Sequence, residues 1–239
     1  MVPDTSSGGE RDAKSCPQGG QFGTFGSGLG VTPPLNRRFN RLLVRVFVAV
    51  RIPVRIQREL ARLTRKLAEL QIPVSWVPPE RMHLTLRFLG QVPERNRRVL
   101  VEALSVAAQD AIPFEVSFGR VGAFPSPRQP HVLWIAVDSA PRLRLLRGSV
   151  ERELTRAGFG SEVGPFHPHV TLGRAIPDSE PGAFRDFVPA CRDIKIDSML
   201  RVSAIDLVRS RLRPSGPEYE LLDRLRLGPG TLPARSSRK

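Results

Sequence analysis

The chain has 239 residues and a formal net charge of +14, from 37 Lys and Arg against 23 Asp and Glu. This length allows one large domain or two small lobes around a shared core, and the excess of positive charge favours a polyanionic partner such as nucleic acid over a simply solvated surface. Two separate cysteines, Cys16 and Cys191, exclude a disulfide framework and a cysteine-rich zinc site.

Three segments differ in composition. Residues 1–40 are rich in Gly, Ser and Pro without an apolar period, which predicts a disordered extension. Residues 229–239 predict a basic flexible tail, and residues 41–228 a single folded domain. The longest apolar run, residues 42–50, is charged and far shorter than a membrane-spanning helix. We therefore expect a cytoplasmic protein without membrane contact, in a reducing compartment.

The first half of the folded segment alternates strands with amphipathic helices. Apolar residues at Ile56, Leu60, Leu63 and Leu67 form one helical stripe, whereas Val44 to Val50 alternate as in a strand. The predicted elements are a strand at 44–50, a helix at 56–70, a strand at 82–89, a helix at 94–109, a strand at 114–118, a proline-rich loop at 122–130 and a strand at 131–137.

The second half repeats this pattern. The predicted elements are a helix at 143–157, a strand at 170–172, a loop at 176–184, a long strand within 194–212, a turn at 214–217 and a returning strand at 219–227. Strands and helices in both halves predict an α+β fold with two similar lobes.

A repeated tetrapeptide is the most informative feature of the chain. His-x-Thr-Leu occurs at 83–86 and again at 169–172, and it includes two of only four histidines. Residues i and i+2 of a strand share a face, so His83 and Thr85 point one way and Leu84 and Leu86 the other. The same alternation applies to His169 and Thr171, and it predicts that Arg87 shares the face of His83.

Two histidines and two hydroxyls suit phosphodiester cleavage or transfer. One imidazole can deprotonate the nucleophile and the other can protonate the leaving oxygen, because the histidine pKa lies near neutral pH. The hydroxyls can bind phosphate oxygens. Without a nearby cluster of carboxylates or cysteines the pair is a poor metal site, so we expect neither a metal nor another cofactor.

The motifs and their flanks resemble one known family. The chain resembles the 2H phosphoesterases, and within them the RNA 2′,3′-cyclic phosphodiesterases, also called 2′–5′ RNA ligases. The resemblance covers both motifs and the segments 45–50, 76–80, 122–125, 132–134, 166–174, 207–210 and 216–219. The resemblance implies a bilobal fold with two pseudo-symmetric lobes, antiparallel sheets flanked by helices, and a central cleft.

The resemblance also implies roles for individual residues. His83 would donate a proton to the leaving 3′ oxygen, His169 would accept one from water, and Thr85 and Thr171 would bind the phosphate. The product would be an RNA 2′-phosphomonoester. The expected partner is RNA with a 2′,3′-cyclic phosphate end, bound by a monomer.

The basic charge of the chain suggests further residues for RNA contact. The candidates are Arg87, Arg128, His167, Arg174 and Arg209, each of which could instead be a solvated surface residue or, for His167, a spacer.

Three other functions remain open at this stage. The protein could be a ligase that joins 2′–5′ junctions, a phosphodiesterase acting on small cyclic nucleotides, or an RNA-binding module without catalysis. Retention of both His-x-Thr motifs argues against the last, since binding alone does not need two proton-transfer groups.

Overall fold

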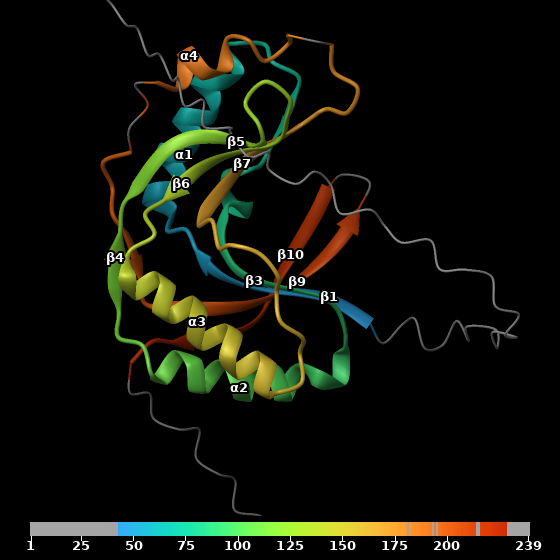
Figure 1. Cartoon of the computed structure of the whole chain (residues 1–239), viewed down its shortest axis with the longest axis vertical. Helices are drawn as coiled ribbons and strands as arrows, with labels where there is room; N and C mark the ends of the chain where they lie inside the picture. Colours follow the sequence, from blue (N-terminus) through green and yellow to red (C-terminus); the bar gives the residue numbers. More distant parts are fainter. Residues whose placement is uncertain (1–42, 181, 193, 195, 214–215, 229–239) are drawn as a thin grey trace, which may run out of the picture. The chain divides into compact units, whose positions relative to one another are not determined.

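The computed structural model describes residues 43–228, apart from 181, 193, 195 and 214–215 (Figure 1). The predicted disordered extension at residues 1–40 and the predicted basic tail at residues 229–239 lie outside the described residues. None of the helices in the described part of the chain combines the length and the apolar character needed to cross a membrane.

Ten strands and four α-helices make up the described part of the chain. The strands are β1 (Leu43–Arg51), β2 (Val74–Trp76), β3 (His83–Pro93), β4 (Phe114–Val116), β5 (Phe118–Pro125), β6 (Pro130–Val137), β7 (His169–Ala175), β8 (Leu200–Val202), β9 (Ala204–Arg213) and β10 (Gly216–Arg226). The helices are α1 (Val54–Ala68), α2 (Arg97–Gln109), α3 (Pro141–Arg156) and α4 (Phe187–Cys191), with short 3-10 helices η2 (Pro79–Arg81) and η3 (Glu94–Asn96). The major predicted strands and helices are therefore confirmed.

The region around residues 114–130 differs from the prediction. The predicted strand at 114–118 is two strands, because Phe114 and Val116 pair with β8 whereas Phe118 begins the pairing of β5 with β6. The predicted loop at 122–130 is wrong in its first part, since β5 continues to Pro125 and pairs there with Pro130. β5 is the last strand of its sheet, and an edge strand tolerates a residue without a backbone N–H.

The main sheet has the order β10-β9-β1-β3-β7-β6-β5, and β2 also pairs with β7. Every pair is antiparallel, and β3 and β7 share only the residue pair Leu84 and Val170. This narrow junction separates a first lobe, built on β10, β9, β1 and β3, from a second lobe, built on β2, β7, β6 and β5. The lobes are not successive halves of the chain, because β9 and β10 return to the first lobe.

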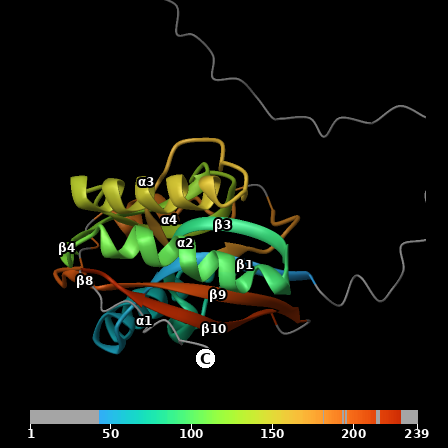
Figure 2. The same ribbon diagram turned by 90° about the horizontal axis from the view of Figure 1, so that it is seen from below.

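Helices α2 and α3 cover one face of the first lobe. Helices α2 and α3 pack against each other, with α2 also contacting β9 and β10 and α3 contacting β3. Figure 2 shows α2 and α3 side by side. In the second lobe, α4 contacts β5. The predicted stripe of α1 is confirmed, since Ile56, Leu60, Leu63 and Leu67 are all buried. Burial of each such side chain contributes about 1.5–3 kcal/mol.

Candidate active site

The two His-x-Thr motifs lie next to each other where the lobes join. His83 begins β3 and His169 begins β7, and the single residue pair between these strands is Leu84 with Val170. Extending this antiparallel register by one residue places His83 opposite Thr171 and Thr85 opposite His169. All four side chains are half-buried, whereas Leu84 and Val170 are completely buried. We call the surface that carries these four side chains the histidine face.

A β-bulge follows each motif at the same position. In the first lobe Ala49 pairs with Thr85 and Val48 with Arg87, which leaves Leu86 as an extra residue. In the second lobe Trp134 pairs with Thr171 and Leu133 with Gly173, which leaves Leu172 as the extra residue. An extra residue reverses the alternation of the residues that follow it. Phe88 and Arg174 therefore lie on the histidine face, and Arg87 and Gly173 on the opposite face.

The prediction that Arg87 shares the face of His83 is wrong, because the bulge turns it away. Its side chain is 6% exposed, and its guanidinium lies 3.0 Å from Glu151 and 3.7 Å from Glu162. The same group donates a hydrogen bond to the carbonyl oxygen of Gly160. Arg147 bridges the same two carboxylates. Arg87 thus ties β3 to α3 and to the loop beyond it.

Gly173 allows β2 to pair with β7 immediately after the second bulge. A Cβ atom at this position would lie 2.4 Å from Cγ1 of Val74 and 3.1 Å from the Trp76 ring. Only glycine therefore lets β2 pair closely with β7 here.

The ring of His83 is held by the last residue of η2 and by two aromatic neighbours. Its Nδ1–H donates a hydrogen bond to the carbonyl oxygen of Arg81 at 2.8 Å, because a carbonyl can only accept. Nε2 is then the nitrogen that can take up or release a proton. The Phe47 ring lies 4.8 Å away, and the Tyr219 ring meets it edge-on at 5.1 Å.

His169 has an equivalent environment in the second lobe. Its Nδ1–H donates to the carbonyl oxygen of His167 at 2.7 Å, again leaving Nε2 for proton exchange. The Phe124 ring lies 5.3 Å away and the Trp134 ring 6.2 Å away. Trp134 can lie beside the motif because Gly122 has no Cβ, which would lie 2.5 Å from the indole ring.

Burial lowers the pKa of both motif histidines. For His83 the positive charges of His169 and Arg174 lower the pKa further, and the hydrogen bond to Arg81 opposes them. For His169 the charges of His167 and Arg174 act in the same direction, against the backbone hydrogen bond. The effect of the His169 charge on the pKa of His83 is consistent with two imidazoles at one site. Because both pKa values are lowered, both imidazoles are predominantly neutral at neutral pH when no anion is bound.

The remaining candidates for RNA contact lie in different places. Arg174 is exposed, on the histidine face, and its charge acts on both motif histidines. His167 is exposed two residues before His169, and Arg128 is exposed in the turn between β5 and β6. Arg209 pairs with Val46 on the helix-covered face and forms ion pairs with Glu94 and Glu220, so the structure does not bring it to the histidine face.

The sequence alone assigns no role to the rings around the histidines. Phe47, Phe124, Trp134 and Tyr219 lie in the flanking segments that carried the family resemblance. Their spacing from each histidine in the chain is irregular, so only strand pairing brings them together. One signal was present in the sequence: Tyr219 is the only tyrosine in the chain.

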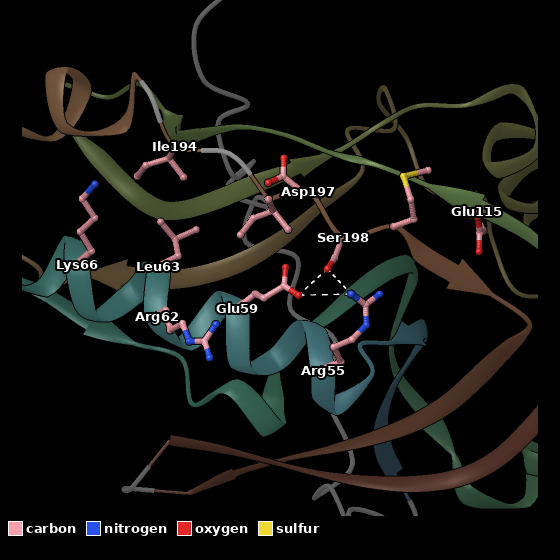
Figure 3. A pocket seen from close by; sticks show the side chains of 11 residues that line it. Arg55, Glu59, Arg62, Leu63, Lys66, Glu115, Ile194, Asp197 and Ser198 are labelled. Carbon is pink, nitrogen blue, oxygen red and sulfur yellow. Dashed lines mark hydrogen bonds and ion pairs between the residues drawn. The ribbon is translucent and has the colours of Figure 1, made fainter.

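A cavity of about 890 Å³ lies elsewhere, between α1 and residues 194 and 196–199 (Figure 3). Ser198 donates to Glu59 and accepts from Arg55 at its edge, and none of the motif residues lines it. In the described part of the chain, no three His, Cys, Asp or Glu side chains gather as metal ligands would.

Comparison with known proteins identifies the family. The LigT like phosphoesterase model matches twice, at residues 50–134 and 135–219, and each match contains one motif. RNA 2′,3′-cyclic phosphodiesterase of Methanothermobacter thermautotrophicus is 31% identical over 184 residues, covering 77% of this chain and 99% of the relative. The Aeropyrum pernix protein of the same name is 37% identical over 164 residues, covering 68% of this chain and 92% of the relative.

A solved structure shows the same fold. Protein TT0787 of Thermus thermophilus aligns with a TM-score of 0.62 and 29% identity, over 77% of this chain and 97% of its own. Two antiparallel lobes that each carry a His-x-Thr motif define the 2H phosphoesterases. Within this class, the chain belongs to the LigT like phosphoesterase family, as its motifs indicated.

Proposed function

We propose that the protein hydrolyses RNA ends that carry a 2′,3′-cyclic phosphate and releases a 2′-phosphomonoester. The observation that carries the proposal is the Leu84–Val170 pair, which brings two His-x-Thr motifs together on one face. The curated relatives named RNA 2′,3′-cyclic phosphodiesterase support the choice of substrate.

In the proposed step, a water oxygen attacks phosphorus in line with the bond to O3′. His169 Nε2 takes a proton from the water, the P–O3′ bond breaks, and His83 Nε2 gives a proton to O3′. The products are a 2′-phosphate and a free 3′-hydroxyl. The hydrogen bonds that hold Nδ1 of each ring support this mechanism, because they leave Nε2 of both rings for proton transfer.

The pKa of His83 has to rise when substrate binds, since a proton donor must be charged. In the free protein burial and nearby positive charges lower its pKa. A bound phosphate is an anion beside the ring and favours the charged form. The assignment of His83 as donor and His169 as acceptor follows the family resemblance, because both rings have similar surroundings.

The threonines and Arg174 bind the phosphate in this proposal. Thr85 and Thr171 share the face of the histidines, so their hydroxyls can donate to the non-bridging oxygens. Arg174 adds a fixed positive charge at the site. The exposed Arg128 and His167 would contact the RNA chain further from the phosphate.

The test is an oligonucleotide that ends in a 2′,3′-cyclic phosphate, incubated with the protein and with EDTA. We expect a 2′-phosphate product, and a loss of about 10²- to 10⁴-fold in kcat for His83→Ala and for His169→Ala, as for removal of acid–base groups. His131→Ala is the matched control, since this exposed histidine lies outside the motifs. A 3′-phosphate product, or near-normal turnover by either motif variant, would overturn the proposal.

The same assay distinguishes the alternatives. Addition of RNA with a 5′-hydroxyl end offers a ribose oxygen in place of water, and a joined product would identify a ligase. Turnover of small cyclic nucleotides without turnover of the oligonucleotide would identify a nucleotide phosphodiesterase. Binding of the oligonucleotide without any product would identify a binding module.

A further inference from the structure

Phe88 is a large aromatic side chain that is 56% exposed beside the candidate active site. Phe88 belongs to an apolar row on this face, and a contiguous exposed apolar surface beside a functional site indicates a ligand or partner. We infer that Phe88 binds the base of the nucleotide on the 5′ side of the terminal one, so that the protein prefers oligonucleotide ends to mononucleotides. This inference rests on the proposed function and deepens it.

The β-bulge at Leu86 places Phe88 on the histidine face. Without the extra residue Phe88 would point towards α2 and α3, and Arg87 would occupy the histidine face. Arg174 has the equivalent position after the second motif. The duplicated motif thus presents an aromatic ring from one lobe and a cation from the other.

A continuous set of rings connects Phe88 to the reacting centre. The Phe47 ring lies 4.8 Å from His83 and 6.0 Å from Phe88, so Phe88 is two ring contacts from the histidine. Strand pairing also aligns Phe88 with Phe47, Val208 and Leu221, and Leu221 is 50% exposed. The histidine face therefore continues from the catalytic position into an apolar row across the first lobe.

A hollow of about 620 Å³ opens at the edge of β3, where this strand has left its pairing with β7. Phe88 lines it from the histidine face, and Arg87, α2 and residues 157–161 line it from the opposite side. Its lining includes a second aromatic ring, Phe159, and the side-chain amides of Gln91 and Asn96. A ring offers a face for base stacking, and an amide offers both a donor and an acceptor to a base edge. This is the chemistry with which proteins bind unpaired nucleotides.

The charges around this surface favour RNA over a protein partner. Arg45, Arg81 and Arg174 all lie close enough to act on the pKa of Tyr219. Within the described residues, no carboxylate forms an ion pair with any of these three arginines. An aromatic surface flanked by unneutralised cations suits a polyanion whose bases are exposed.

The test compares two substrates in the intact protein: adenosine 2′,3′-cyclic monophosphate, and a trinucleotide ending in a 2′,3′-cyclic phosphate. Phe88→Ala should lower kcat/KM for the trinucleotide about 10- to 100-fold, the range of one lost base–aromatic stack. The ratio of kcat/KM between trinucleotide and mononucleotide should fall by the same factor. Phe88→Leu should behave like Phe88→Ala, and Phe88→Trp should keep the preference, because stacking needs an aromatic ring.

Leu145→Ala is the control for loss of an exposed apolar side chain, since Leu145 is 71% exposed on α3. An equal loss on both substrates, or no loss in Phe88→Ala, overturns the inference and leaves the proposed function intact. Failure of the unmodified protein on both substrates overturns the proposed function instead. A dimer that Phe88→Ala converts to a monomer would show that a second copy of the chain covers this face, and would also overturn the inference.

Discussion

Replacement of Arg87 by Met distinguishes two roles for this arginine. Strand alternation predicts an RNA contact on the histidine face, whereas the structure buries the guanidinium between Glu151 and Glu162. The variant keeps much of the side-chain volume and removes the charge. It also removes the hydrogen bond to the carbonyl oxygen of Gly160.

The expected loss of stability follows from the contacts. Breaking a buried ion pair by removing one partner costs about 3–5 kcal/mol, because the other charge stays buried without compensation. Here Arg147 remains 2.6 Å from Glu151 and 2.8 Å from Glu162, and both carboxylates are partly exposed. We therefore expect about 2–3 kcal/mol for Arg87→Met, or a Tm lower by about 5–10 °C for a domain of this size.

Urea unfolding and the salt dependence of RNA binding measure the two roles separately. Arg45→Met is the control for the unfolding measurement alone, since Arg45 is exposed and no described carboxylate pairs with it. The control should change the free energy of unfolding by less than about 0.5 kcal/mol. Arg87→Met could instead unfold like the unmodified protein and reduce the steepness of log K for RNA binding against log salt by about one. Arg87 would then contact RNA, and its assignment as a buried ion-pair residue would be wrong.

Three further predictions concern the reaction. Thr85→Val and Thr171→Val should each lower kcat about 10²- to 10³-fold while Thr→Ser retains most of it, and equal kcat values for the Val and Ser variants would remove the phosphate-binding role. Because the pKa of each motif histidine is lowered from 6.5, the optimum of kcat/KM should lie below pH 6.5, with a rise as His169 loses its proton and a fall as His83 does. The phosphate of the bound substrate should raise the pKa of His83 and so move the fall in kcat to higher pH. An optimum of kcat/KM above pH 6.5 would contradict the lowered pKa values of the free protein. Turnover should be unchanged after EDTA treatment, whereas a loss that a divalent ion restores would identify a metal-dependent reaction.

Much of the fold was predictable because each element has its own local pattern. The apolar stripe of α1 and the run of apolar residues in β1 are each visible within one short segment, and both elements are confirmed. β1 is buried on both faces from Val46 to Val50, so its burial does not alternate. The predicted loop at 122–130 failed because three prolines dominated the local pattern. Pairing of Pro125 with Pro130 at the sheet edge overrode that local signal.

The sheet order was not predictable from local patterns. Nothing near residues 204–226 indicates that β9 and β10 pair with the first lobe and not with the second. That choice depends on backbone hydrogen bonds between segments far apart in the chain.

The candidate site divides in the same way. Repetition of His-x-Thr-Leu and the period-two alternation of strands sufficed to predict that His83, Thr85, His169 and Thr171 lie on one face, because both are properties of a few neighbouring residues. Their joint action in catalysis stays a prediction. The faces of Arg87 and Phe88 depended on a bulge that strand pairing reveals, and on carboxylates contributed by a distant helix and loop. Register and burial are non-local, so only the tertiary structure could decide that Phe88, and not Arg87, lies beside the histidines.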